Sequence, residues 1–121
     1  MKDLRFSDMG YVKSSGNSVK VDLFEVGSAV LNFEIDTLIC VSNKGCLSKS
    51  SFNEEYLSSS YPDNILQNIF LAKPIFNREN IAINERGFEQ NIGSIKYKVD
   101  DRGTYFKDSK KGILIKLKTL K

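Results

Sequence analysis

The residues of this chain that could do chemistry are adjacent carboxylates and two cysteines. Glu54 and Glu55 form one carboxylate pair, and Asp100 and Asp101 form another. A pair of carboxyl groups can serve as general acid and base only if both converge on the reacting part of one substrate. Neighbouring side chains instead point to opposite faces of a strand, and they lie about 100° apart on a helix. We therefore expect both pairs to be solvated charges on a turn or a helix surface.

The chain contains no histidine, which narrows the possible functions further. Histidine is the commonest general base and metal ligand, so Ser-His-Asp and Cys-His mechanisms are excluded. A zinc site would have to combine two cysteines with carboxylates. The sequence also has no phosphate-binding loop and no nucleophile elbow. We predict that the protein is not an enzyme and has no catalytic residue, metal or cofactor.

The two cysteines, Cys40 and Cys46, allow two interpretations. Gly45 marks a turn between them, so they could form a local disulfide, which would indicate an oxidising compartment and add modest stability. Alternatively, they are unrelated thiols, with Cys40 acting as a small core hydrophobe.

Length and composition indicate a single folded domain spanning residues 1–121. Hydrophobic residues make up 40% and charged residues 27% of the chain, as in ordinary globular proteins. The net charge is +3, too small for a typical nucleic-acid binder, so no nucleic-acid partner is expected. Part of the excess lies in Lys107, Lys110, Lys111, Lys116, Lys118 and Lys121. These lysines could attract an anionic membrane surface or simply be solvated residues that protect edge strands.

No run approaches the roughly 18 consecutive apolar residues of a membrane-spanning helix. The N-terminus lacks an apolar signal core. The protein is therefore either cytoplasmic or an envelope protein given without its signal and anchor.

Strict polar/apolar alternation predicts strands at about residues 4–42 and 80–120. Between them, Ser51 and Glu54 fit a capping box that starts a helix. Pro62 suits the first turn of a second helix, and Pro74 would stop it. The helices are expected at about residues 51–72. The predicted fold is α+β: a curved antiparallel sheet, forming an incomplete, half-open β-barrel. Two short helices between the fourth and fifth strands would cover its concave face.

Several segments in the second half carry a family resemblance. They are Leu66 to Pro74 (Leu-Gln-Asn-Ile-Phe-Leu-Ala-Lys-Pro), Gly87 to Gln90 (Gly-Phe-Glu-Gln), Ile95 to Tyr97 and the closing run from Ile113 to Leu120. Their pattern resembles the bacterial outer-membrane lipoprotein receptor family typified by LolB, with its periplasmic relative LolA. Ala72 replaces a glycine of that pattern, and Ile69 or Phe70 stands where a tryptophan is expected. The resemblance implies a half-open barrel whose apolar hollow holds acyl chains, at the periplasmic face of the outer membrane.

The leading hypothesis is a monomeric, non-enzymatic module of the cell envelope that binds lipid or an acylated lipoprotein. The predicted lining comprises Val21, Leu23, Leu31, Phe33, Ile35, Tyr97, Val99, Ile113, Ile115 and Leu117, closed by Ile65, Ile69 and Phe70. Each of these residues could instead fill an ordinary dry core. The alternative is a structural or protein-interaction domain of a surface or periplasmic lipoprotein, such as an immunoglobulin-like sandwich without a lipid cavity.

Overall fold

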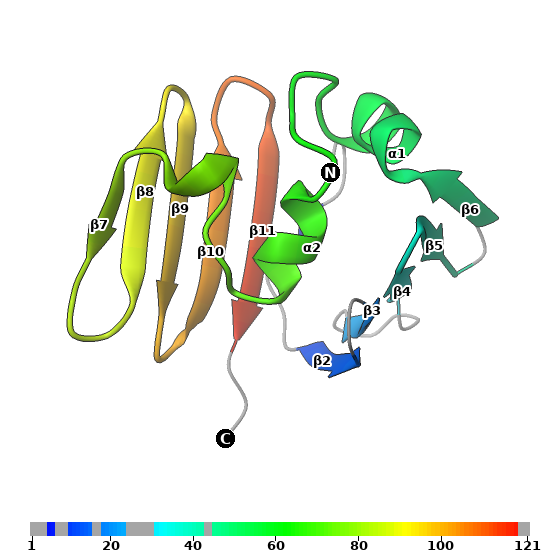
Figure 1. Cartoon of the computed structure of the whole chain (residues 1–121), viewed down its shortest axis with the longest axis horizontal. Helices are drawn as coiled ribbons and strands as arrows, with labels where there is room; N and C mark the ends of the chain where they lie inside the picture. Colours follow the sequence, from blue (N-terminus) through cyan, green and yellow to red (C-terminus); the bar gives the residue numbers. More distant parts are fainter. Residues whose placement is uncertain (1–4, 7–9, 16–17, 24–30, 43–44, 119–121) are drawn as a thin grey trace.

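The chain folds into two sheets with two short helices, and the α+β class is confirmed (Figure 1). The computed structural model describes residues 5–6, 10–15, 18–23, 31–42 and 45–118. A single curved sheet was expected, and that expectation is wrong, because the strands separate into two hydrogen-bonded sets. Six strands precede the helices among the described residues, and five follow them. The expected position of the helices between a fourth and a fifth strand is therefore wrong, in part because residues 45–48 form a strand that the alternation did not predict.

The small sheet is an antiparallel meander of five strands in sequence order. It contains β2 (Gly10–Ser15), β3 (Ser18–Leu23), β4 (Leu31–Ile35), β5 (Leu38–Val41) and β6 (Gly45–Ser48). Phe33 on β4 lies opposite both Val21 on β3 and Val41 on β5. All three side chains are buried, whereas Asn32 and Glu34 are exposed. The alternation predicted for this segment is therefore confirmed.

The large sheet has six strands, five of them antiparallel to their neighbours. In spatial order these are β1 (Arg5–Phe6), β11 (Ile113–Lys118), β10 (Gly103–Asp108), β9 (Ile95–Asp100), β8 (Phe88–Ile92) and β7 (Ile81–Ile83). Only β1 runs parallel, beside β11. Gly87 precedes β8, where a Cβ would lie 2.0 Å from the carbonyl oxygen of Val99. This close backbone approach requires glycine.

The first helix, α1 (Lys49–Tyr56), begins earlier than predicted, because its cap lies three residues before Ser51. Its N-cap is Ser48, whose hydroxyl accepts a hydrogen bond from the amide of Ser51 at 3.2 Å. The expected capping box from Ser51 to Glu54 is therefore wrong. Because β6 leads directly into the helix, the cap lies at the last residue of that strand.

The second helix, α2 (Ile65–Phe70), ends by a mechanism that does not involve Pro74. The amide of Lys73 donates to the carbonyl of Asn68, and the amide of Ala72 donates to that of Ile69. This is the Schellman pattern, with Ala72 in the left-handed conformation at φ +57. Ala72 thus occupies a position that glycine usually takes, and Pro74 only follows the completed cap.

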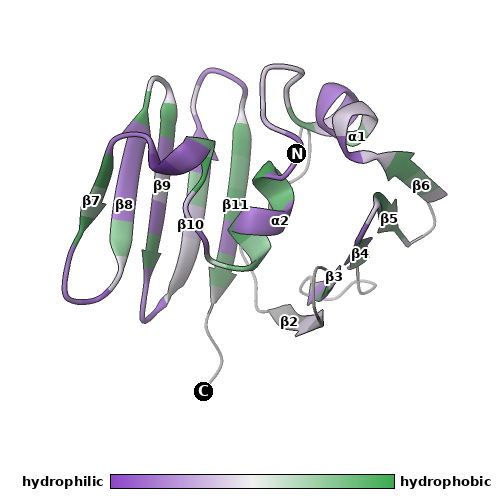
Figure 2. Cartoon of the chain, in the orientation of Figure 1, coloured by the Kyte–Doolittle hydropathy of each residue, from purple (hydrophilic) through white to green (hydrophobic). Residues whose placement is uncertain are grey.

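Helix α2 lies between the two sheets and joins them through its side chains. It contacts β3 of the small sheet and β10 of the large sheet. Ile65, Leu66, Ile69 and Phe70 are all buried, which accounts for most of this six-residue helix. Hydrophobic residues recur along β5, β11 and α2 (Figure 2). None of the helices among the described residues is long and apolar enough to cross a bilayer.

Candidate functional site

Most of the residues predicted to line an acyl-chain hollow lie in the packed interior of the protein. Those that are buried belong to one hydrophobic cluster: Val21, Phe33, Ile35, Ile65, Ile69, Phe70, Tyr97, Ile113, Ile115 and Leu117. Val99 is half-buried and packs against this cluster. Leu23 and Leu31 lie opposite each other on β3 and β4, but their side chains are outside the described part of the structure.

Aromatic contacts fill the space between the helices and the small sheet. The ring of Phe33 lies 5.4 Å from that of Phe70 and 6.5 Å from that of Phe52, centroid to centroid. On the large sheet, the Tyr97 and Phe106 rings are 6.2 Å apart. The hydroxyl of Tyr97 donates to the carbonyl of Lys73 at 2.8 Å, and burial raises the pKa of Tyr97 above its ordinary range. Such contacts are typical of a core.

The cysteines are joined in the structure, so the disulfide interpretation is confirmed. Cys40 on β5 and Cys46 on β6 lie directly opposite each other in the antiparallel ladder. The bond therefore fastens β6, the strand that leads into α1, to the rest of the small sheet.

Three of the four paired carboxylates are exposed as predicted, whereas Asp100 is half-buried at the end of β9. Glu54 and Glu55 are exposed on α1, and Asp101 is exposed in the turn between β9 and β10. One carboxylate oxygen of Asp100 accepts hydrogen bonds from the amides of Arg102 and Gly103, which fixes that turn. Among the described residues, no group of three or more cysteines and acids could hold a metal ion.

A buried carboxylate that the sequence analysis did not single out lies at the end of β10. Asp108 accepts hydrogen bonds from the hydroxyls of Tyr61 and Ser94 and from the amides of Lys110 and Lys111. Burial raises the pKa of Asp108, but these donors outweigh burial and hold it below its ordinary value of 3.8. Burial and the Asp108 carboxylate raise the pKa of Tyr61. The cluster ties the chain before α2 to the turn after β10.

The outer face of the large sheet gathers positive charge around one tyrosine. Tyr105 on β10 lies opposite Lys98 on β9 and Lys116 on β11. Directly opposed residues share a face of the sheet, and the ammonium of Lys116 lies 5.8 Å from the centroid of the Tyr105 ring. In the next row Lys107 lies opposite Lys96. Such like-charge pairs destabilise a sheet, so folding alone does not explain this arrangement.

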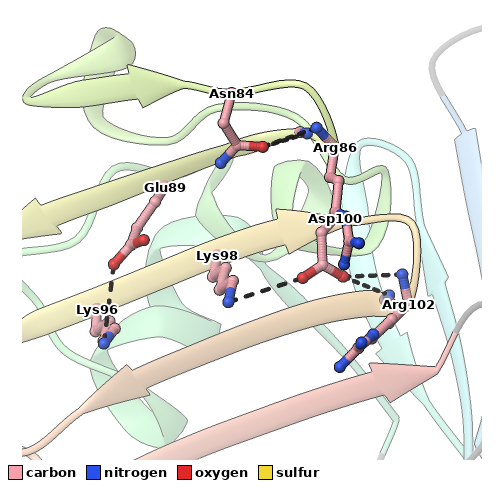
Figure 3. A network of polar contacts seen from close by, with 9 residues as sticks. Asn84, Arg86, Glu89, Lys96, Lys98, Asp100 and Arg102 are labelled. Atoms are coloured by element: carbon pink, nitrogen blue, oxygen red, sulfur yellow. Dashed lines mark hydrogen bonds and ion pairs between the residues drawn. The ribbon is translucent and has the colours of Figure 1, made fainter.

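We call this surface the basic face and define it as Lys96, Lys98, Arg102, Tyr105, Lys107 and Lys116. Its acidic neighbours are Glu89, 3.8 Å from Lys96, and Asp100, 3.9 Å from Lys98 (Figure 3). Within the described chain, the charged groups of Arg102, Lys107 and Lys116 have no acidic partner. The basic face therefore keeps an excess of positive charge.

A shallow hollow of about 410 Å³ opens on the basic face. Its lining comprises Lys96, Lys98, Asp100, Arg102, Gly103, Thr104, Tyr105, Lys116 and Leu117. A neighbouring hollow of about 400 Å³ shares Lys98, Asp100 and Arg102 with it and adds Asn84, Glu85 and Arg86. Figure 3 shows that Arg86 and Arg102 come from two different turns on either side of Asp100, and that Arg102 contacts Asp100 through its backbone amide. Anionic groups could bind here by hydrogen bonds and charge, without a metal.

Sequence analysis identified only part of the basic face. Lys107 and Lys116 were among the C-terminal lysines considered for membrane attraction, but Lys110 and Lys111 lie apart from them in the turn after β10. Tyr105 was missed, because the apolar alternation drew attention to inward-facing residues. The polar residues that alternate with the inward-facing apolar residues on the same strands could have revealed this surface.

Comparisons with protein-family models, curated proteins and solved structures return no match for this chain.

Proposed function

We propose that the protein is a non-enzymatic module that docks reversibly on an anionic phospholipid surface through its basic face. The observation that carries the proposal is the unbalanced positive charge around Tyr105 on three adjacent strands. Lysine and arginine near an anionic leaflet contribute about 1 kcal/mol each. Tyrosine suits the level of the lipid headgroups, because its ring is apolar and its hydroxyl is polar.

The expected binding is weak and depends on salt. Two of the lysines have acidic neighbours, so the surplus charge supplies only a few kcal/mol. Surface charges are screened beyond roughly 8 Å at physiological ionic strength. A stable attachment would need a second signal. The Cys40–Cys46 disulfide supports a location in an oxidising compartment such as the cell envelope.

A nucleic-acid partner is less well supported by the same surface. Proteins that bind single strands on a sheet stack several bases on aromatic side chains. On the basic face, as far as the structure describes it, Tyr105 is the only aromatic residue. Docking on an anionic lipid surface requires exposed positive charge, and the basic face offers it.

The proposal is tested by sedimentation with vesicles of phosphatidylcholine alone or with added phosphatidylglycerol. We expect binding only to the anionic vesicles, with release when NaCl rises from about 0.1 M to about 0.5 M. The double variant Lys98→Glu/Lys116→Glu should bind at least about tenfold more weakly, because it reverses charge beside Tyr105. Lys110→Glu/Lys111→Glu changes the net charge equally, away from the basic face, and is the matched control.

Two results would overturn this proposal. One is equal loss of binding in both double variants, which would indicate attraction by net charge alone. The other is saturable binding to a single-stranded oligonucleotide that exceeds binding to the anionic vesicles.

Acyl-chain binding inside a half-open barrel remains the competing proposal. The predicted lining residues whose side chains are described lie on α2 or on the strands and belong to or pack against one apolar cluster. An acyl chain would contribute about 0.8 kcal/mol per buried CH2, but it would have to displace the side chains of α2 that now fill this region. Native mass spectrometry separates the proposals, since a co-purified lipid that survives Lys98→Glu/Lys116→Glu would support the interior site. In that case the helices would act as a movable cover of the concave face.

A further inference from the structure

A second pocket, distinct from the basic face, lies between α2 and the connection to β7. Its volume is about 630 Å³, within the range of small-molecule sites. The lining comprises Pro62, Asn64, Ile65, Asn68, Phe76, Asn77 and Glu79. None of these residues lines the hollow around Tyr105.

The wall of this pocket is a turn with an unusual backbone. Phe76, Asn77 and Arg78 are consecutive residues in the left-handed region, with φ of +48, +52 and +66. Asparagine tolerates this conformation, but it is unfavourable for other residues with a side chain. Non-glycine residues remain in such conformations only when their surroundings hold them there, and they cluster at ligand sites.

Gln90 on β8 provides that support from inside the protein. Its side chain is fully buried. Its oxygen accepts from the amide of Ile75 at 2.9 Å, and its nitrogen donates to the carbonyls of Ile75 and Glu79 at 2.8 Å each. Three hydrogen bonds from one rigid strand therefore clamp both ends of the left-handed turn. The pocket wall is fixed by the large sheet rather than by the turn itself.

The polar groups of the pocket are free to bind a ligand. In the described structure, the side chains of Asn68, Asn77 and Glu79 make no hydrogen bond or ion pair with the protein. Asn64 accepts one hydrogen bond from Lys49 at 3.4 Å, which leaves its NH2 group available. Asparagine amides both donate and accept, and a carboxylate only accepts.

We propose that this pocket binds a neutral saccharide. Its amides can pair with hydroxyls acting as donors or acceptors, and the Glu79 carboxylate can accept from two hydroxyls. Phe76, half-buried and in edge contact with Tyr61 at 6.1 Å, supplies an apolar surface for the C–H groups of a sugar ring. The described lining contains no cation, so a phosphate or carboxylate ligand is disfavoured.

The test is a titration of the 15N-labelled protein with glucose and with N-acetylglucosamine, followed by NMR. We expect saturable shift changes in the side-chain amides of Asn64, Asn68 and Asn77 and in the backbone of residues 76–79. Asn77→Gly keeps the left-handed conformation and removes the amide, and it should weaken binding up to about tenfold. Glu79→Gln provides a second, isosteric variant that tests the acceptor role.

Asn80→Gly is the matched control. Asn80 also has a left-handed backbone, at φ +51, but it lies outside the pocket lining. The proposal is overturned if neither sugar gives saturable shifts, or if Asn80→Gly weakens binding as much as Asn77→Gly. Because vesicle binding uses other residues, failure here leaves the proposed membrane docking unaffected.

Discussion

At the scale of single residues, Asp108 shows how a carboxylate can be buried without a cation. Four donors surround it, two hydroxyls and two backbone amides. A carboxylate with several hydrogen bonds is stabilised in its charged form. Because Tyr61 precedes α2 and Ser94 lies in the turn before β9, one side chain organises segments that are far apart in the sequence.

We predict that Asp108→Asn destabilises the protein by about 1–3 kcal/mol at neutral pH, because the charged acceptor is lost. The folded-state pKa of Asp108 lies below its ordinary value of 3.8. The ionised Asp108 carboxylate therefore stabilises the folded state above that pH, and this stabilisation is lost as the pH falls through the folded-state pKa. Urea denaturation of both proteins at neutral and acidic pH should show the difference in unfolding free energy shrinking in acid. Asp101→Asn, in an exposed turn, is the control, and a difference that is constant with pH would refute this role.

At the scale of elements, the connection from α2 to β7 is shaped by its contacts rather than by its own propensity. It contains left-handed residues with large side chains, such as Phe76 and Arg78, which disfavour that conformation. The hydrogen bonds of Gln90 compensate for this. The buried Gln90 on β8 thus holds the connection in place by hydrogen bonds.

We predict that Gln90→Ala costs about 3 kcal/mol, since it removes three hydrogen bonds and leaves the amide of Ile75 buried without a partner. Hydrogen exchange should accelerate at residues 75–79 before it does so in β9 and β10. Asn91→Ala, on the exposed face of the same strand, should change neither the free energy of unfolding nor the hydrogen exchange of residues 75–79. Uniform acceleration across the large sheet would argue against a local clamp.

At the scale of the whole molecule, the two sheets are held together through α2. Phe70 is 4% exposed and packs on Phe33 of the small sheet, while α2 also contacts β10. Because both sheets share a single interior, loss of the helix should destabilise both sheets together.

We predict that Phe70→Ala lowers the free energy of unfolding by about 3–5 kcal/mol. Unfolding followed by far-ultraviolet circular dichroism and by tyrosine fluorescence should remain one coincident transition. Ile83→Ala is the control, because Ile83 is 69% exposed on the edge strand β7 and its loss should be nearly neutral. Two separate transitions in Phe70→Ala would show that the sheets are independently stable.

The sequence by itself determined which side faces inward in strands with clear alternation, such as β4 and β9. Alternation of polar and apolar residues placed Phe33 and Ile35 in the interior, and it placed Lys96 and Lys98 on the outer face of their strand. It also indicated two helices and a turn between the cysteines. These features are local, because side-chain direction follows directly from a backbone period of two residues.

Only the tertiary structure decided which strands pair and what their outer faces form together. A period of two residues does not specify a partner strand, so two sheets and one curved sheet are equally compatible with it. The cap at Ser48 depends on β6 leading directly into α1. The meeting of Lys98, Tyr105 and Lys116, and the left-handed turn held by Gln90, arise from hydrogen bonds between residues distant in sequence. Both candidate sites depend on such long-range pairing, and that is the physical reason why local pattern alone could not locate them.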